Sequence, residues 1–292
     1  MPLTVSRGAV REIVPLINAG LGIADALADA SHALRVLYVR VVGTALLAVD
    51  NAVAPRDFDP AHPYVGADRM AIREMGIALW ELFEREGLAI YTLNYDSLLM
   101  EALLDSRDGR VVYDGFPYGE LAYPLAPWPN QLPLYPLHGT LGAYQTPDGS
   151  VRKTRMEDVR ARRMLEGWRD GDFGPGLPAV VLGDAKRHSI RQEPFASYYE
   201  ALSVDLERAS SVVVGGYGFG DVPLNTRLAR YLAADNQRLL QDWRPTATQA
   251  VDDVVAALRG ALPAGSTLDE AQVLPVDVGL PSAEAVRALV GP

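Results

Sequence analysis

The chain has 292 residues, and 49% of them are hydrophobic, which is enough for the core of one large α/β domain. The formal net charge is -10, which argues against general binding to nucleic acids or anionic membranes. The sequence contains no cysteine, so disulfides, thiolate zinc sites and a cysteine nucleophile are excluded. We expect a cytoplasmic protein, because no apolar stretch reaches the ~18 residues of a membrane span and the N-terminal residues lack a secretory pattern.

The first part of the chain is expected to be helical. Apolar residues over Ile23–Leu37 recur at the spacing of a buried helix face, and further helices are expected over Tyr38–Val53 and Asp68–Glu86. Together they predict a helical segment over residues 20–87.

Short apolar runs then alternate with helical patterns. Strands are expected over Leu88–Leu93, Arg110–Tyr113, Pro178–Leu182, Ser211–Val214 and Val273–Val278, and the segment Leu137–Ala143 carries His138. Helices are expected over Ser97–Leu104, Met156–Trp168, Ser197–Arg208, Leu224–Leu240, Ala247–Leu262 and Ser282–Leu289. The segment Asp114–Pro136 is rich in proline and glycine and is expected to be an ordered loop. This order predicts an α/β fold, a Rossmann-like, mainly parallel sheet with flanking helices and helical additions. It forms one domain over residues 1–292, with a polar helical insertion at 145–176.

Polar and glycine-rich residues follow several of the predicted strands. They are Asn94-Tyr95-Asp96, His138-Gly139, Gly183-Asp184 and Gly215-Gly216-Tyr217-Gly218. Ligands of open parallel sheets bind beyond the carboxyl ends of the strands, so these residues are candidates for one site. Taken singly, such an asparagine is more often a turn former, and such a histidine is more often structural.

Three of these segments resemble SIR2-like proteins, which are related to sirtuins. The segments are Thr92-Leu93-Asn94-Tyr95-Asp96, Leu137-His138-Gly139-Thr140-Leu141 and Val213-Val214-Gly215-Gly216-Tyr217-Gly218-Phe219-Gly220-Asp221, and they follow one another in the order seen in that family. The stretch Asp114-Gly115-Phe116 is similar to a bacterial branch of the superfamily, which includes NAD-cleaving defence effectors. The resemblance implies NAD or ADP-ribose as the ligand, with NAD as a substrate.

The resemblance assigns catalytic roles to Asn94, His138 and Asp96. Cleavage between nicotinamide and ribose creates positive charge on the ribose, and the neutral amide of Asn94 can hold ribose hydroxyls or a water without quenching that charge. An imidazole such as that of His138 exchanges protons near neutral pH and can act as the base. Asp96 can stabilise developing charge, and it can equally cap the helix that begins after it.

Binding roles follow from the same resemblance. The residues expected to contact the cofactor are Thr92, Gly139, Gly215, Gly216, Tyr217, Gly218 and Asp221. The family normally begins its site with a glycine-rich phosphate loop, and the nearest string here is Asn18-Ala19-Gly20-Leu21-Gly22. Gly20 and Gly22 either cradle the phosphates or belong to a plain turn between helices, and both interpretations stay open.

The zinc ribbon of true sirtuins is excluded, because the sequence has no cysteine. No metal is expected, since no two histidines lie at metal-ligand spacing. Residues 152–163 carry a basic cluster, either a solvated helix face or a contact for a phosphate or partner: Arg152, Lys153, Arg155, Arg160, Arg162 and Arg163.

These observations predict an NAD glycohydrolase, with anti-phage defence as the role that the resemblance implies. A non-catalytic sensor or interaction module that binds NAD or ADP-ribose is the alternative, and an NAD-dependent deacylase is a third hypothesis. A homo-oligomer and a regulatory partner are both compatible with the sequence.

Overall fold

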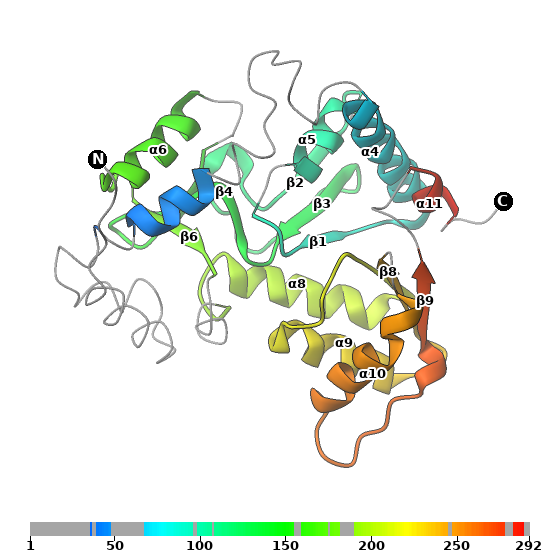
Figure 1. Cartoon of the computed structure of the whole chain (residues 1–292). Coiled ribbons are helices and arrows are strands. Elements are labelled where there is room, and N and C mark those ends of the chain that lie inside the picture. Colours follow the sequence, from blue (N-terminus) through cyan, green and yellow to red (C-terminus); the bar gives the residue numbers. More distant parts are fainter. Residues whose placement is uncertain are drawn as a thin grey trace. The chain divides into compact units, whose positions relative to one another are not determined.

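The computed structural model describes residues 36, 39–47, 67–95, 98–106, 108–154, 159–174, 176–181, 190–244, 247–277 and 283–288 (Figure 1). The chain divides into two compact units, one formed by residues 1–76 and 88–199 and the other by residues 77–87 and 200–292. The single-domain expectation stays a prediction, and each unit is described by itself below.

The first unit contains a three-stranded parallel sheet in the order β1-β3-β2. Its strands are β1 (Ile90–Thr92), β2 (Val111–Tyr113) and β3 (Gln131–Pro136). The two outer strands pair with different parts of β3, since Val111 lies opposite Gln131 whereas Ile90 lies opposite Leu134. Each part of β3 therefore has a neighbouring strand on one side only. Proline has no N–H to donate, so it is tolerated in β3 because one side of the strand needs no donor.

The central strand β3 corrects one prediction. Residues 131–136 belong to the segment Asp114–Pro136, for which an ordered loop is expected because the segment is rich in proline and glycine. That prediction is wrong for these six residues, because the staggered neighbours leave room for both prolines.

A second sheet of the first unit is antiparallel, with the order β5-β4-β6. It comprises β4 (Gly139–Gln145), β5 (Val151–Lys153) and β6 (Leu177–Val180). Strand β4 thus begins directly after His138, and Arg152 and Lys153 lie in a strand rather than on a helix face.

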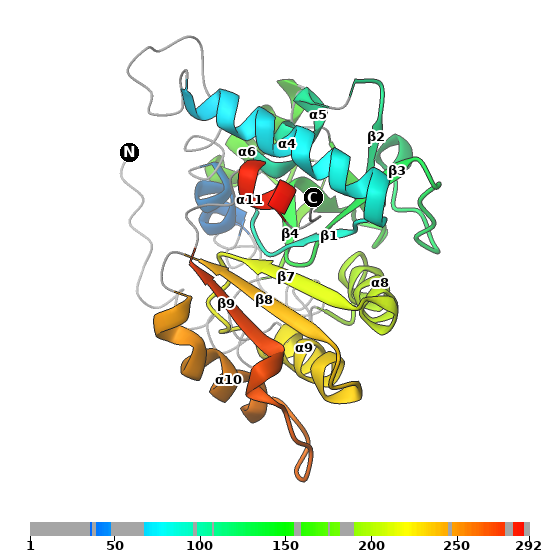
Figure 2. The same ribbon diagram turned by 90° about the vertical axis from the view of Figure 1, so that its right-hand side faces the viewer.

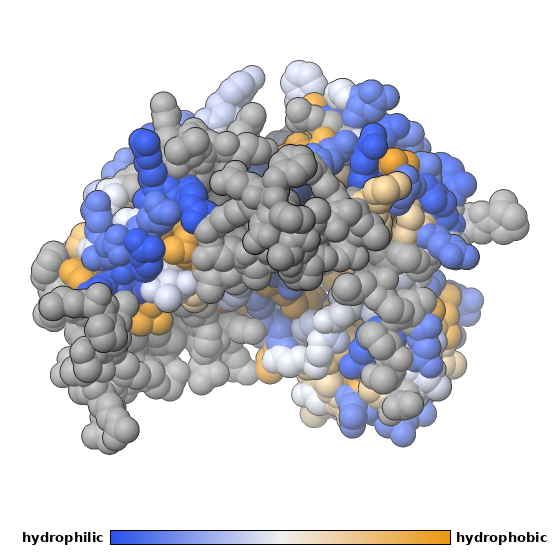
Figure 3. Space-filling view, turned by 45° about the horizontal axis from the view of Figure 1, so that its top comes forward, coloured by the Kyte–Doolittle hydropathy of each residue, from blue (hydrophilic) through white to orange (hydrophobic). Residues whose placement is uncertain are grey.

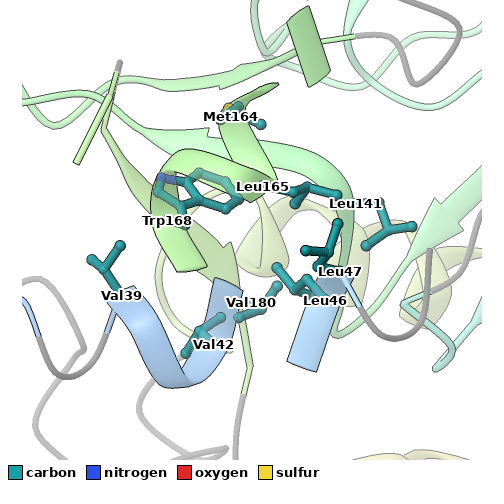
Figure 4. Close-up of a cluster of buried hydrophobic side chains, with 9 residues drawn as sticks. All are labelled: Val39, Val42, Leu46, Leu47, Leu141, Met164, Leu165, Trp168 and Val180. Atoms are coloured by element: carbon teal, nitrogen blue, oxygen red, sulfur yellow. The ribbon is translucent and has the colours of Figure 1, made fainter. Parts of the chain in front are cut away.

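Helix α6 (Val159–Asp170) and the helical residues 39–47 cover this antiparallel sheet. Figure 4 shows Val39, Val42 and Trp168 as members of one apolar cluster, and the indole N–H of Trp168 donates to the carbonyl of Gly176 at 3.0 Å. The spacing of Met164, Leu165 and Trp168 places them on one face of α6. The complete cluster is Val39, Val42, Leu46, Leu47, Leu141, Met164, Leu165, Trp168 and Val180.

A largely buried ion pair holds the end of β2. The ammonium of Lys153 in β5 lies 2.5 Å from the carboxylate of Asp114, which also accepts the N–H of Phe116 at 3.0 Å. The hydroxyl of Tyr198 in α8 (Phe195–Arg208) donates to the carbonyl of Asp114 at 2.9 Å, and its ring stacks on Tyr135. Asp114 therefore connects β2 to both β5 and α8.

The second unit contains a parallel sheet in the order β7-β8-β9. The strands are β7 (Ser211–Gly215), β8 (Leu239–Arg244) and β9 (Val273–Asp277), and Figure 2 shows α9 (Val222–Ala234) and α10 (Val251–Gly260) beside them. The predicted helix over Leu224–Leu240 is wrong at its end, because the helix ends at Ala234 and the last two residues lie in β8. The buried amide of Gln272 accounts for this ending, since its nitrogen donates to the carbonyls of Leu232, Asp235 and Arg238.

The remaining predicted helices are confirmed where the structure describes them. These are α4 (Ala67–Glu86), α5 (Leu98–Asp105) and α11 (Ala283–Ala288), whereas the helix expected over Ile23–Leu37 lies outside the described residues except for residue 36. The structure also has 3-10 turns at η1 (Pro117–Gly119), η3 (Thr248–Ala250) and η4 (Glu270–Gln272). The α/β fold class is likewise confirmed by the parallel sheets and their flanking helices. Within the described residues, no helix combines the length and the apolar character that a membrane crossing requires. Figure 3 shows hydrophilic and hydrophobic residues interspersed over the described part of one face.

The ion pair of Asp114 and Lys153 predicts a difference between two neighbouring residues of β5. Lys153→Met leaves the carboxylate of Asp114 buried without its counter-ion, and we expect the free energy of unfolding to fall by about 3 kcal/mol in urea at pH 7. Arg152→Met is the matched control, because Arg152 pairs with Glu120 in solvent and this pair contributes at most about 1 kcal/mol. Equal losses in the two variants would contradict the buried pair.

Acidic pH should abolish the difference in the free energy of unfolding between Lys153→Met and wild type. Burial alone raises the pKa of Asp114, but the charge and hydrogen bond of Lys153, with the N–H of Phe116, outweigh it and hold this pKa below its ordinary value. A lowered folded-state pKa stabilises the fold above the unfolded-state pKa, and this contribution is lost as the pH falls through the folded-state value. Urea titrations at decreasing pH should therefore bring Lys153→Met and wild type together at the acid end.

Candidate active site

Asn94 lies just beyond the carboxyl end of β1. Its backbone N–H donates to the hydroxyl of Thr92 at 3.1 Å, which turns the chain out of the strand, and Asn94 is exposed. The predicted binding residue Thr92 therefore uses its hydroxyl to shape the turn that presents the side chain of Asn94.

His138 occupies the turn that leads from β3 into β4. The residue is only 5% exposed, so the surrounding protein shields its ring from bulk water. The N–H of the preceding Leu137 donates to the carbonyl of Thr92 at 2.8 Å, and the carbonyl of His138 accepts the N–H of Val181 at 2.8 Å. The histidine is thus held by the ends of both β1 and β6.

The register of β1 and β3 places the two predicted catalytic residues at equivalent positions just beyond the ends of these strands. Thr92 lies opposite Pro136, and Asn94 and His138 each follow their paired residue by two positions. Parallel neighbouring strands end at the same edge of a sheet, so the exposed Asn94 and the buried His138 both lie at this edge. The structure brings together Thr92, Asn94, His138 and Gly139 in the first unit.

Gly139 is required by packing as well as by backbone conformation. Its φ is 94°, in the region that favours glycine, and a Cβ there would collide with the carbonyl oxygen of Ala179 and lie 3.0 Å from the Cα of Val180. The close approach of β6 is therefore what this glycine permits. Its predicted role in cofactor binding stays a prediction.

The second unit presents a glycine-rich loop at the carboxyl end of β7. Its glycines (Gly215, Gly216, Gly218 and Gly220) are exposed, and a Cβ on any of them would meet no atom within 4 Å among the described residues. The backbone conformation requires glycine at Gly216, whose φ is 64°. At the others, neither packing nor a positive φ explains the absence of a side chain, and an open backbone of this kind suits a ligand that lies close to it.

The polar side chains of this loop hold the loop itself. The hydroxyl of Tyr217 accepts the N–H of Asp221 at 3.0 Å and lies 2.8 Å from the side-chain oxygen of Asn225. The carboxylate of Asp221 caps α9 by accepting the N–H of Leu224, and the amide of Asn225 donates to the carbonyl of Phe219. Burial raises the pKa of Tyr217 well above its ordinary value, so its hydroxyl stays protonated.

Two charged residues beside this loop were not expected from the sequence. Asp242 is fully buried at the end of β8, and its carboxylate accepts the guanidinium N–H of Arg244 at 2.8 Å. Arg244 also lies over the ring of Phe219, 5.6 Å from its centre, and the carbonyl of Trp243 accepts the N–H of Gly216. Burial raises the pKa of Asp242, although Arg244 opposes this shift.

The sequence did contain a signal for this pair. The apolar residues Leu239 and Leu240 lie just before the two charges, and a short apolar run is typical of a buried parallel strand. That signal was hidden because the apolar residues Leu239 and Leu240 were assigned to the preceding helix.

Several predicted site residues lie outside the described residues. They are Asp96, Gly20, Gly22, Gly183 and Asp184. Part of the basic cluster is described: Arg152 pairs with Glu120, Lys153 with Asp114, and Arg162 with Glu166. Over the ranges that the structure describes, no group of three or more histidine, aspartate or glutamate residues could hold a metal ion.

Parallel strands flanked by helices, and a glycine-rich loop that leads from a strand into a helix, define a Rossmann-like α/β protein. The profile of the SIR2-like domain family matches residues 88–253, which is more than half of the chain. The chain belongs to the SIR2-like domain family, and this membership implies an NAD-related activity. No match was found among curated proteins.

The packing of Gly139 predicts that even a methyl group is harmful there. We expect Gly139→Ala to lower the free energy of unfolding by at least about 2 kcal/mol, because strain at positive φ adds to the overlap with β6. Gly149→Ala is the control, since Gly149 has a φ of 85° but open space around it, and its loss should be about 1 kcal/mol. Chemical denaturation measures both, and a loss at Gly139 no larger than that at Gly149 would refute the packing argument.

Proposed function

We propose that the protein is an NAD glycohydrolase, which cleaves NAD with water to nicotinamide and ADP-ribose. The observation that carries this proposal is the level placement of Asn94 and His138 at the edge of the β1-β3 sheet. An amide that can hold ribose hydroxyls and an imidazole that can accept a proton are the two groups that this reaction needs.

In the proposed reaction, the bond between the ribose C1′ and the nicotinamide nitrogen breaks, and its electron pair leaves with nicotinamide. The ribose then carries positive charge, and the neutral amide of Asn94 orients the hydroxyls and the water without forming a competing ion pair. A water oxygen attacks C1′, and its proton passes to the ring of His138. Asp96 is the proposed accompanying acid, which stabilises the developing charge.

The glycine-rich loop is the proposed contact for the nucleotide part of NAD. Its exposed glycines offer backbone rather than side chains, and the polar groups of Tyr217 and Asp221 support the loop from within. The loop leads into the 13-residue helix α9, whose N-terminus is already capped by the carboxylate of Asp221, so the exposed loop backbone is the proposed contact. Gly20 and Gly22 are proposed as a further phosphate contact.

The first test is nicotinamide release from NAD by the purified protein. We expect turnover by wild type and a loss of at least about 100-fold in kcat for Asn94→Ala and for His138→Gln, because each removes a group that acts on the transition state. Asn236→Ala is the matched control, since Asn236 is an exposed asparagine in the turn between α9 and β8. Its activity should equal that of wild type.

Three results would overturn the proposal. Absence of turnover with measurable NAD or ADP-ribose binding would favour the non-catalytic sensor or interaction module. Nicotinamide release only in the presence of an acylated lysine peptide would favour the deacylase. Undiminished turnover in both site variants would place the chemistry elsewhere.

The glycine-rich loop gives a separate prediction for binding. Gly218→Leu places a large side chain on the exposed backbone without a clash in the described protein, so the thermal midpoint should not change. We expect the Kd for NAD to rise by at least about tenfold, which corresponds to about 1.4 kcal/mol. Gly260→Leu at the end of α10 also enters open space and should leave the Kd unchanged in calorimetry. Equal Kd values in both variants would remove the loop from the binding site.

A further inference from the structure

Tyr95 forms a link between the two proposed catalytic residues. It directly follows Asn94, and its hydroxyl donates to the carbonyl of Val181 at 2.5 Å. The N–H of the same Val181 donates to the carbonyl of His138 at 2.8 Å. One residue at the end of β6 therefore binds both the neighbour of Asn94 and the backbone of His138.

We propose that Tyr95 is a positioning residue, which fixes Asn94 relative to His138 through Val181. This inference rests on the proposed function. Tyr95 itself takes no part in the chemistry, because its hydroxyl is directed to a backbone carbonyl. Its contribution is to hold an exposed turn residue at a constant distance from a shielded histidine.

Further contacts close the same ring of interactions. The carbonyl of Tyr95 accepts the N–H of Leu141 at 3.1 Å, and the carbonyl of Thr92 accepts the N–H of Leu137 at 2.8 Å. These two bonds flank His138 along the chain. Asn94 likewise lies between Thr92 and Tyr95, so these two bonds bracket both proposed catalytic residues along the chain.

The ring of Tyr95 packs against the apolar cluster formed by residues 39–47, β4, α6 and β6. Apolar packing alone would accept phenylalanine, so the hydroxyl is the informative group. A buried hydroxyl is favourable only when it is hydrogen-bonded, and here its partner is the residue that holds His138. The sequence motif places Tyr95 next to Asn94, whereas its partner lies 86 residues away.

Tyr95→Phe tests the link by removing only the hydroxyl. We expect kcat for NAD cleavage to fall about tenfold while KM stays within about twofold, because misplacement of reacting groups slows the chemical step more than binding. Tyr144→Phe is the matched control, since Tyr144 packs against the same cluster from β4. Its kcat should not change. The number of NAD molecules bound per protein should equal that of wild type in both variants, which separates positioning from partial unfolding.

A second readout does not depend on activity. The chain has four histidines, so the ring resonance of His138 can be assigned in histidine-labelled protein by comparison with His138→Gln. Tyr95→Phe should shift this resonance, and Tyr144→Phe should not. Wild type without NAD turnover would overturn the proposed function alone, whereas the resonance would still test the link. An unchanged resonance, an unchanged kcat, or equal effects of the two tyrosine variants would overturn the role of Tyr95.

Discussion

The pairing of β1 with the second half of β3 is the constraint on which the site depends. Thr92 lies opposite Pro136, and strands β1 and β3 end together at this pair. Asn94 and His138 therefore occupy equivalent positions, each two residues beyond the end of its strand. A shift of one residue along this ladder would turn alternate side chains to the opposite face and separate the pair. The bond from Leu137 to Thr92 extends the pairing one step past the last strand residue and fixes the register where it matters.

A parallel sheet alone would leave these two turns free at one edge. The antiparallel sheet restrains them, because β4 starts directly after His138 and the end of β6 lies against that start. The approach is close enough to require glycine at Gly139. The apolar cluster below β4 and β6 then receives the ring of Tyr95, so the core that stabilises the first unit also holds the turn of Asn94.

The elements that could be predicted are those whose signal is local. The apolar run before Asn94 identified β1, and the three motifs in order identified the family and the candidate residues. The central strand β3 was missed because its prolines are tolerated only through the stagger of β1 and β2, which is a property of the assembled sheet. The contacts of Val181 with Tyr95 and His138 join residues far apart in sequence, and no local pattern encodes them.

The proposed catalytic residues of the first unit and the proposed binding loop of the second unit are held in different ways. In the first unit the side chain of Asn94 is presented to solvent, and the restraint comes from backbone bonds and packing around it. In the second unit the side chains of Tyr217, Asp221 and Asn225 are used within the loop, and the glycine backbone is presented instead. Backbone groups suit phosphate and ribose, which need many donors at close range, whereas a reacting bond needs one amide and one base at fixed positions. These different proposed roles fit the sequence, in which Asn94 and His138 are informative only as part of the ordered motifs, whereas the loop is marked by its run of glycines.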